Sequence, residues 1–257
     1  MKPALRISLI AAGVLFLAAA SAGESLGSMD PSPILKITKI VVKLGQLPQV
    51  AKIEAARAKV LRSAKWPRIH MANVSVTGPQ QIWVFERYDT LGAIAQDLET
   101  IEKTPELKTQ LDLLDEAEGP LLESKREITA TYQKDISYRP KFDWSEVHYW
   151  EIIWIHLRQG HHGEYVENRV MTREEHERGA FDTHQMMYAV QSGEQSGTFM
   201  VIRPMKTLGL LDALHAADDG EPTTPEEKKK KIELFAASSL TEEEAYFHLD
   251  PTMSYAP

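Results

Sequence analysis

Eight short segments of the chain have a β-strand pattern, either apolar residues at alternate positions or a run dense in aromatic and β-branched residues. In residues 37–44, for example, Ile40, Val42 and Leu44 fall on one face. Gly78-Pro79 indicates a tight turn between the second and third segments. The predicted strands are residues 37–44, 68–76, 81–88, 127–136, 149–158, 181–190, 198–203 and 244–249.

Stretches between these strands have the spacing of amphipathic helices. The first covers residues 50–64 and ends before Trp66-Pro67. Thr90 and Thr104 are suited to cap the next two helices, and Pro105 suits a first helical position. The second half of the chain gives three more predicted helices, at residues 164–178, 208–217 and 225–239.

Short sequences recur at a constant distance along the chain. TLGAI at residues 90–94 returns as TLGLL at 207–211, and SYRP at 137–140 returns as SYAP at 254–257; both offsets are 117 (207 − 90 and 254 − 137). TPE at 104 returns at 224, an offset of 120, which indicates a three-residue insertion between. We interpret the chain as a tandem duplication, and the tyrosine–proline endings as structural positions that end strand pairing.

Each predicted unit has the order strand, helix, strand, strand, helices, strand, which is the ferredoxin-like β-α-β-β-α-β order. The fold class is therefore α+β, with the first unit at residues 37–140, a linker at 141–148 and the second unit at 149–257. Residues 1–22 have the positive start, apolar run and small-x-small site of a signal peptide, and residues 23–36 read as a flexible leader. The mature protein is expected to be periplasmic or secreted, without stable membrane insertion after cleavage.

Composition excludes several classes of function. The formal net charge is −8, which disfavours a nucleic-acid partner because phosphate binding needs clustered Lys and Arg. The chain has no cysteine, so thiolate metal sites and thiol nucleophiles are excluded. The hydrophobic fraction of 43% is sufficient for folded cores.

With this element order and duplication, residues 37–257 resemble the dimeric α+β barrel superfamily, which includes NIPSNAP-type proteins and antibiotic-biosynthesis-type monooxygenases. The resemblance implies that the two units join their sheets into one intramolecular barrel, with a small-molecule ligand in the interior. Association into a homodimer is also open. No motif carries a catalytic residue over to this chain.

In that geometry the strand at 149–158 has two distinct faces. Ile153, Ile155 and Leu157 form an aliphatic face that should meet helices. The opposite face, expected toward the interior, carries large aromatic and basic residues: Trp150, Ile152, Trp154, His156 and Arg158. Ordinary core packing is the competing interpretation of Trp154.

The candidate site follows from these faces. His156 is the proposed general base and Arg158 the oxyanion-stabilising group. The ligand-binding candidates are Trp154, His184, Tyr188, Trp83 and Arg87, since an aromatic pocket with a few polar groups suits a small molecule.

Eight of the nine histidines follow residue 147, yet none has the spacing of a metal site, so no metal is predicted. No cofactor is expected. The superfamily resemblance adds one alternative, a haem held as in chlorite dismutase-like proteins, with His156 or His184 as candidate ligand.

The functional hypothesis is an exported small-molecule-binding protein or a cofactor-independent monooxygenase-like enzyme. The alternatives are a non-catalytic interaction protein and a haem-binding, chlorite dismutase-like protein.

Overall fold

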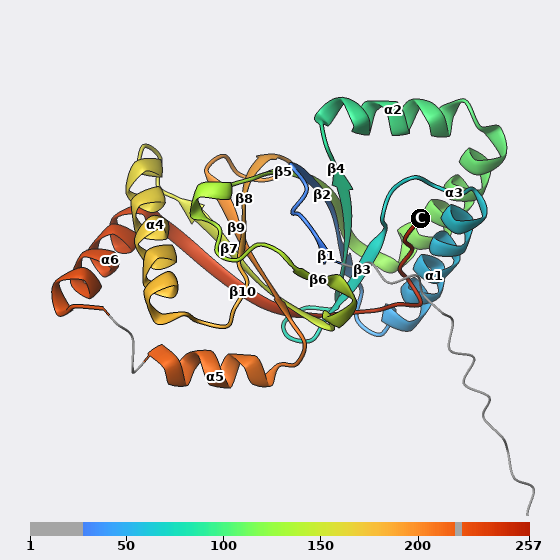
Figure 1. Ribbon diagram of the computed structural model, residues 1–257. Helices are drawn as coiled ribbons and strands as arrows, with labels where there is room; N and C mark the ends of the chain where they lie inside the picture. Colours follow the sequence, from blue (N-terminus) through green and yellow to red (C-terminus); the bar gives the residue numbers. More distant parts are fainter. Residues whose placement is uncertain (1–27, 219–222) are drawn as a thin grey trace, which may run out of the picture.

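Eight antiparallel strands form a closed barrel in a computed structural model that describes residues 28–218 and 223–257 (Figure 1). The order around the barrel is β10-β3-β4-β2-β5-β8-β9-β7. The predicted signal peptide at 1–22 lies outside the described residues. The barrel strands are β2 (Ile34–Val42), β3 (Met71–Ser75), β4 (Gln81–Tyr88), β5 (Leu122–Tyr132), β7 (Tyr149–Leu157), β8 (Met186–Ser192), β9 (Thr198–Met205) and β10 (Ser239–Leu249).

The helices of the first half of the chain lie outside one side of the barrel, and those of the second half lie outside the opposite side (Figure 1). One buried cluster lies between α1 and the strands of the first half, and another lies between α4 and the strands of the second half. In both halves a second long helix packs beside the first, α3 on α1 and α6 on α4. The helices are α1 (Leu47–Ser63), α2 (Leu91–Glu102), α3 (Pro105–Glu118), α4 (His162–Gly179), α5 (Gly209–Asp218) and α6 (Pro225–Ser238).

All eight predicted strands and six predicted helices are present, with shifted ends. The largest shifts are five residues: β8 begins later than predicted (186 − 181), and β5 and β10 begin earlier (127 − 122 and 244 − 239). The early starts of β5 and β10 have a common cause. Their first halves, residues 123–127 and 241–244, are charged or polar and exposed, so they pair through the backbone without an apolar face. A polar run next to a helix lacks the period-two signal on which the prediction relied.

The two halves of the barrel have the same internal order. The first sheet runs β3-β4-β2-β5 and the second runs β8-β9-β7-β10. The barrel closes where the last strand of each half meets the other half, through β5–β8 and β10–β3. This arrangement is an intramolecular α+β barrel, and the common origin of its halves stays a prediction.

The segment between the halves closes one end of the barrel. It contains β6 (Phe142–Asp143), which pairs with β1 (Ser28–Met29), so part of the predicted leader is ordered. Phe142, Trp144 and Val147 are buried in the barrel core. The ring of Trp144 lies 5.4 Å from that of Trp150. The predicted linker is therefore a packed element of the core.

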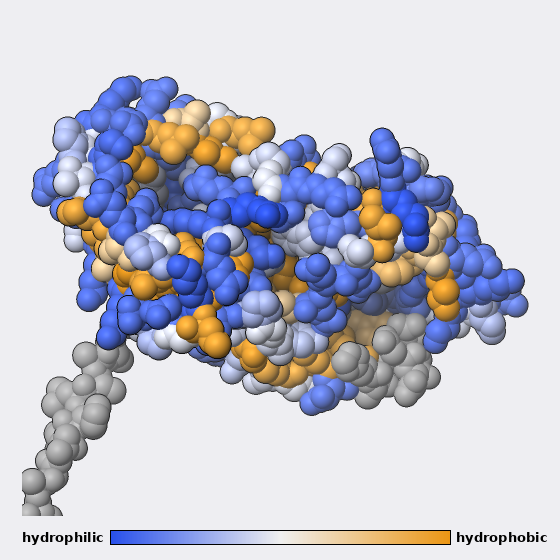
Figure 2. All heavy atoms as spheres, turned by 180° about the vertical axis from the view of Figure 1, so that it is seen from behind, coloured by the Kyte–Doolittle hydropathy of each residue, from blue (hydrophilic) through white to orange (hydrophobic). Residues whose placement is uncertain are grey.

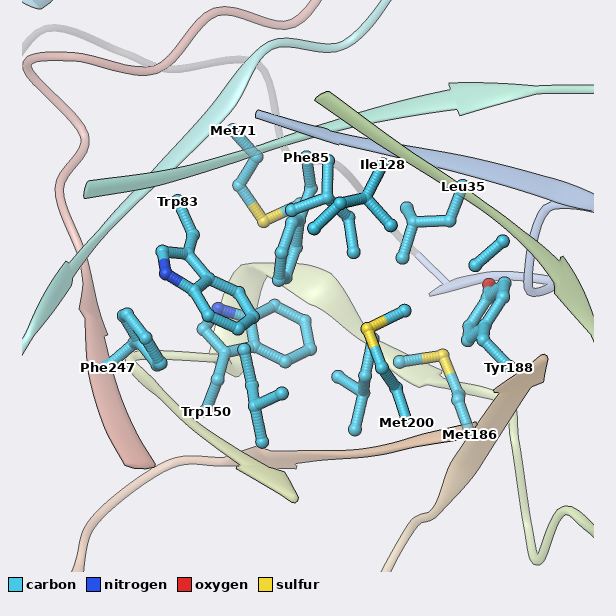
Figure 3. Packing of buried hydrophobic residues seen from close by; sticks show 14 of the residues in the cluster. Leu35, Met71, Trp83, Phe85, Ile128, Trp150, Met186, Tyr188, Met200 and Phe247 are labelled. Atoms are coloured by element: carbon cyan, nitrogen blue, oxygen red, sulfur yellow. The ribbon is translucent and has the colours of Figure 1, made fainter. Parts of the chain in front are cut away.

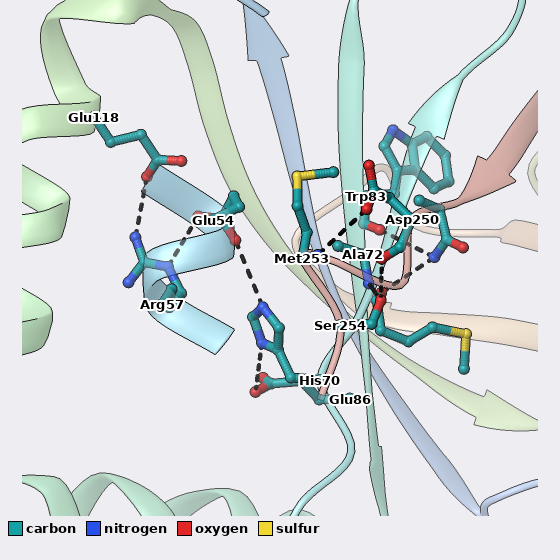
Figure 4. Close-up of polar contacts among 12 residues, drawn as sticks. Glu54, Arg57, His70, Ala72, Trp83, Glu86, Glu118, Asp250, Met253 and Ser254 are labelled. Carbon is teal, nitrogen blue, oxygen red and sulfur yellow. Dashed lines mark hydrogen bonds and ion pairs between the residues drawn. The ribbon is translucent and has the colours of Figure 1, made fainter. Parts of the chain in front are cut away.

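Serines of the repeated SYxP motif make the same hydrogen bonds in both halves. Ser137 Oγ accepts from the Met187 amide at 3.0 Å and donates to the Gln133 carbonyl at 2.7 Å. Ser254 Oγ accepts from the Ala72 amide at 3.0 Å and donates to the Asp250 carbonyl at 2.7 Å (Figure 4). Each serine thus ties the end of one half to a strand of the other.

The tyrosines of the motif also reach across. Tyr138 Oη lies 3.0 Å from the His176 carbonyl at the end of α4. Tyr255 Oη donates to the Trp66 carbonyl, just beyond α1, at 3.0 Å. Their role is structural, as the sequence indicated, and it consists of fixing the helix end of the opposite half.

Removing either hydroxyl should therefore weaken the fold. Tyr138→Phe and Tyr255→Phe are each expected to lower the free energy of unfolding by about 1–2 kcal/mol, because each removes a hydrogen bond to a carbonyl at a helix end. The two losses should be nearly additive because the motifs bond to opposite halves. Urea titration followed by circular dichroism measures this, with Tyr149→Phe as the control, and no loss in either variant would contradict the role.

The surface is largely hydrophilic, with apolar patches (Figure 2). One gathers at the end that carries α2 and α3, where Leu91, Leu98 and Leu113 are exposed. Among the described residues, no helix combines the length and apolar character needed to cross a membrane.

Candidate functional site

The barrel interior is filled by a core of aromatic and sulfur-containing side chains (Figure 3). Trp83 and Trp154 meet edge to face at 5.7 Å, and Phe85 lies 6.0 Å from Trp150. A cavity of about 10 Å³ lies beside Tyr188, which is room for about one water molecule. A small-molecule ligand in the interior, as the resemblance implied, would have to displace this core.

The two predicted faces of β7 are as the sequence indicated. Trp150, Ile152 and Trp154 belong to the interior core, and Ile155 and Leu157 pack under α4. The competing interpretation of Trp154, ordinary core packing, fits its exposure of 6%.

The predicted site residues of β7 continue toward one end of the barrel. His156 Nδ1 lies 2.8 Å from Thr198 Oγ1, so the imidazole has a fixed partner. Arg158 lies beyond the end of the strand and lines an open surface groove with Gly160 and His161. His156 is not among the residues that line this groove, and its role as a base stays a prediction.

The other candidates lie toward the opposite end. Tyr188 Oη donates to the Ser32 carbonyl at 3.3 Å, and the Arg87 guanidinium lies 5.2 Å from the Trp144 ring. His184 precedes β8, and its Nδ1 lies 2.6 Å from the Arg139 carbonyl. It lines a separate cleft of about 440 Å³ beside α5. The structure thus distributes the predicted residues over both ends of the barrel.

A cavity with different chemistry, also open to solvent, lies between the second sheet and helices α4 and α6. Its volume is about 300 Å³, within the range of small-molecule sites. Four cationic side chains line it together with one carboxylate. The lining residues are Ile153, Arg169, Thr172, Glu175, His176, Gln185, Val201, Arg203, Lys228 and Lys231.

Two of the cations already have carboxylate partners. Arg203 forms an ion pair with Glu151, its neighbour across β7 and β9. Lys231 forms an ion pair with Glu175, whose side chain is fully buried. Arg169 has a neutral partner, the Gln185 side-chain oxygen at 3.2 Å.

Three nitrogen atoms in this lining are buried and have no hydrogen-bond partner among the described residues: Arg169 Nε, Arg203 Nε and His176 Nδ1. Buried polar atoms of this kind are rare and call for a partner, such as a ligand or water. They belong to α4 and β9, on opposite walls of the cavity.

His176 is held in place by two aromatic rings, Tyr138 at 5.3 Å and Phe181 at 5.2 Å. Burial, together with the charges of Arg169 and Arg203, lowers the pKa of His176 to about 4. The imidazole is therefore neutral at physiological pH, and the cavity has a positive electrostatic potential.

Haem does not fit the cavity at His176. A porphyrin needs broad apolar walls beside its axial ligand, whereas this cavity has only Ile153 and Val201 as apolar lining residues. The cleft at His184 has a mixed lining, with apolar residues such as Phe142 and Met205 beside the charged Asp182 and Lys206. In the part of the chain that the structure describes, no cluster of three His, Asp or Glu side chains is arranged to hold a metal ion.

Solved structures with the same fold include proteins described as a monooxygenase, an anthrone oxidase-like protein and a chlorite dismutase. One is a candidate monooxygenase from Lactobacillus acidophilus, with a TM-score of 0.55 and 10% identity, covering 88% of this chain and 96% of its own. Another is an anthrone oxidase-like protein, with a TM-score of 0.57, 9% identity and coverage of 87% and 94%. A third is a mutant chlorite dismutase from Candidatus Nitrospira defluvii in complex with cyanide. Its TM-score is 0.53 and its identity is 12%, and the match covers 86% of this chain and 92% of its own.

At such low identity these neighbours establish the fold alone. They agree with the monooxygenase-like and chlorite dismutase-like part of the predicted resemblance. No protein-family model matches the sequence, and no curated protein matches it.

Proposed function

We propose that the protein is an exported small-molecule-binding protein with a monooxygenase-like barrel, and that its ligand site is the cavity between the second sheet and α4 and α6. The observation that carries the proposal is the set of three buried nitrogens without a hydrogen-bond partner, on Arg169, Arg203 and His176, among the residues that line this cavity. Its volume of about 300 Å³ can hold a small molecule, whereas the barrel interior leaves about 10 Å³. Export is supported by the signal-peptide pattern of residues 1–22.

Binding is favoured over oxygenation by the chemistry of His176. A cofactor-independent oxygenase needs a base that removes a proton from its substrate, and the best base has a pKa near the working pH. With a pKa of about 4, His176 is a weak base. The fold of the oxygenase-like neighbours supports small-molecule handling in general, and binding is the function that these side chains serve best.

We also infer that the two halves are copies of one unit, each specialised differently. The constant offset of the sequence echoes supports this, as do the matched hydrogen bonds of Ser137 and Ser254.

Closing the cavity tests the proposed function. The double variant Arg169→Glu with Thr172→Arg would place a carboxylate and a guanidinium three residues apart on α4, as Glu54 and Arg57 are on α1. The new arginine should fill the cavity while its charge is balanced. In a fragment screen by NMR, we expect wild-type protein to show hits that shift the α4 and β9 amides, and the double variant to lose them.

Lys229→Glu is the matched control, because Lys229 is exposed on α6 and does not line the cavity. It should retain every hit. Fragments that bind the folded double variant as well as wild type, or that shift the indole signals of Trp83 and Trp154 instead, would place the ligand elsewhere.

A further inference from the structure

The two halves of the barrel carry oppositely charged residues at corresponding positions. Lys36 and Glu86 are neighbours across β2 and β4, and Glu151 and Arg203 are neighbours across β7 and β9. These strand pairs occupy the same place in their sheets. The lysine of the first half therefore corresponds to a glutamate in the second, and the glutamate corresponds to an arginine.

A third correspondence is fixed by the SYxP motifs. His70 forms an isolated bridge with Tyr255, and Gln185 forms the same bridge with Tyr138. The offset from His70 to Gln185 is 185 − 70 = 115, and on the preceding helices 169 − 54 is also 115. Glu54 therefore corresponds to Arg169.

In the first half this region is a network of ion pairs between side chains of the protein (Figure 4). His70 Nε2 lies 3.5 Å from Glu54 Oε2, and Arg57 Nε donates to the other Glu54 oxygen at 2.9 Å. Arg57 also contacts Glu118 at 3.4 Å, and His70 lies 3.9 Å from Glu86. The charges are paired within the protein.

In the second half the same contact exists with the opposite charge. Arg169 reaches Gln185 as Glu54 reaches His70. Thr172 stands at the position of Arg57 (172 − 57 = 115), so a short side chain replaces a long one. The shorter side chain of Thr172 leaves the space of the cavity open. The exchange of Glu54 for Arg169 places a cation beside that space.

Building on the proposed function, we propose that the ligand of this cavity is a small oxyanion, carried on an organic carboxylate or a phosphate. The oxyanion would take the place that the Glu54 carboxylate holds in the first half. Arg169 and Arg203 would donate through their unpartnered Nε–H groups, and His176 would donate from Nδ1. Charge-assisted hydrogen bonds from guanidinium groups are the strong contacts for such ligands.

Nearby carboxylates do not cancel this preference. Glu175 and Glu151 are engaged with Lys231 and Arg203. On β10, Glu242 interacts with Arg169 electrostatically, and Glu244 with Glu151, but both glutamates are exposed and neither lines the cavity. Arg169 and the exposed Lys228 thus keep the cavity lining cationic.

A pair of ligands that differ only in charge tests the inference. Benzoate and benzamide have nearly the same shape, and their ring fits, because benzene fills a cavity of about 150 Å³. NMR titration of the full mature chain should show benzoate binding at least about tenfold more tightly than benzamide. A factor of about ten is what one hydrogen bond to a charged group contributes to binding. Bound benzoate should also raise the pKa of His176, because a nearby anion stabilises imidazolium.

Arg169→Gln removes the guanidinium whose hydrogen-bond partner is the neutral Gln185, so it should bring benzoate to the level of benzamide and leave benzamide unchanged. Arg169→Lys should retain part of the preference, and Lys229→Gln, the exposed control on α6, should retain all of it. Inorganic phosphate should compete with benzoate in wild type and not in Arg169→Gln.

The outcomes separate the two proposals. If benzamide binds in the cavity as well as benzoate does, the oxyanion inference is overturned while the proposed binding site stands. If neither compound nor phosphate binds wild type, and the fragment screen also gives no hit on α4 and β9, both fail. Benzoate binding that Arg169→Gln does not change would overturn the assignment of this cavity to the anion.

Discussion

Trp150→Ala is expected to lower the free energy of unfolding by about 3–5 kcal/mol, one of the largest effects of any single substitution in this protein. Trp150 is 1% exposed and packs against Phe85, Phe142 and Trp144. Its removal leaves a hole in the middle of the barrel core that the closed sheet cannot collapse to fill. Guanidinium titration at constant temperature gives the measurement.

Tyr149→Ala is the control, because Tyr149 is the preceding residue on β7 and is only half-buried. Its loss should be clearly smaller. Benzoate should still bind the folded fraction of Trp150→Ala, since the cavity at Arg169 lies on the other side of the sheet. A loss of under about 1 kcal/mol would show that the interior is loosely packed and would reopen it as a ligand site.

The second large effect concerns Glu54. Glu54→Gln should cost about 3 kcal/mol or more, because it leaves His70 and Arg57 facing a neutral group in a buried place. Burial disfavours the Glu54 carboxylate, yet the hydrogen bond from His70 and the charge of Arg57 lower its pKa to about 2. A lowered pKa contributes stability above pH 4.5 that is lost as the pH falls toward 2; the shift corresponds to about 3 kcal/mol.

The pKa of His70 shifts in the opposite direction from that of Glu54. Burial disfavours its imidazolium, but hydrogen bonds with Glu54 and Glu86 raise its pKa above 6.5. Its contribution is complete below pH 6.5 and is lost as the pH rises through the raised value. The network should therefore be strongest between about pH 4.5 and 6.5.

Unfolding titrations at pH 2.5, 5.5 and 8 measure both contributions. In Glu54→Gln the loss of stability between pH 5.5 and 2.5 should be smaller than in wild type. Glu99→Gln, a change of an exposed glutamate on α2, should alter stability by less than about 0.5 kcal/mol at any of these pH values. Equal acid sensitivity of wild type and Glu54→Gln would contradict the assignment.

The strands and their order along the chain could be predicted because a short run that is apolar on both faces, as at residues 152–155, is typical of a buried strand. The paired SYxP motifs set the register of the halves. The interior could not be judged in the same way. An inward face with Trp150 and Trp154 is compatible with a pocket or with a solid core, and the choice depends on side chains from β2, β4, β9 and the segment at Phe142 and Trp144.

The cavity at Arg169 could not be found by motif, because its residues come from α4, β7, β9 and α6 and look like ordinary helix surface. One signal was present in the sequence. Aligning the halves places Arg169 against Glu54 and Thr172 against Arg57. Only the structure shows that these positions face the sheet, where a change of sign has an energetic consequence.

The exchanged SYxP contacts have a consequence for how the chain behaves as a whole. Ser137 and Tyr138 complete the second half, and Ser254 and Tyr255 complete the first. Neither half contains all the partners of its own helix end and strand. A substitution that weakens one half should therefore also remove support from the helix end and strand of the other, so the stabilities of the two halves are coupled although their chemistry differs.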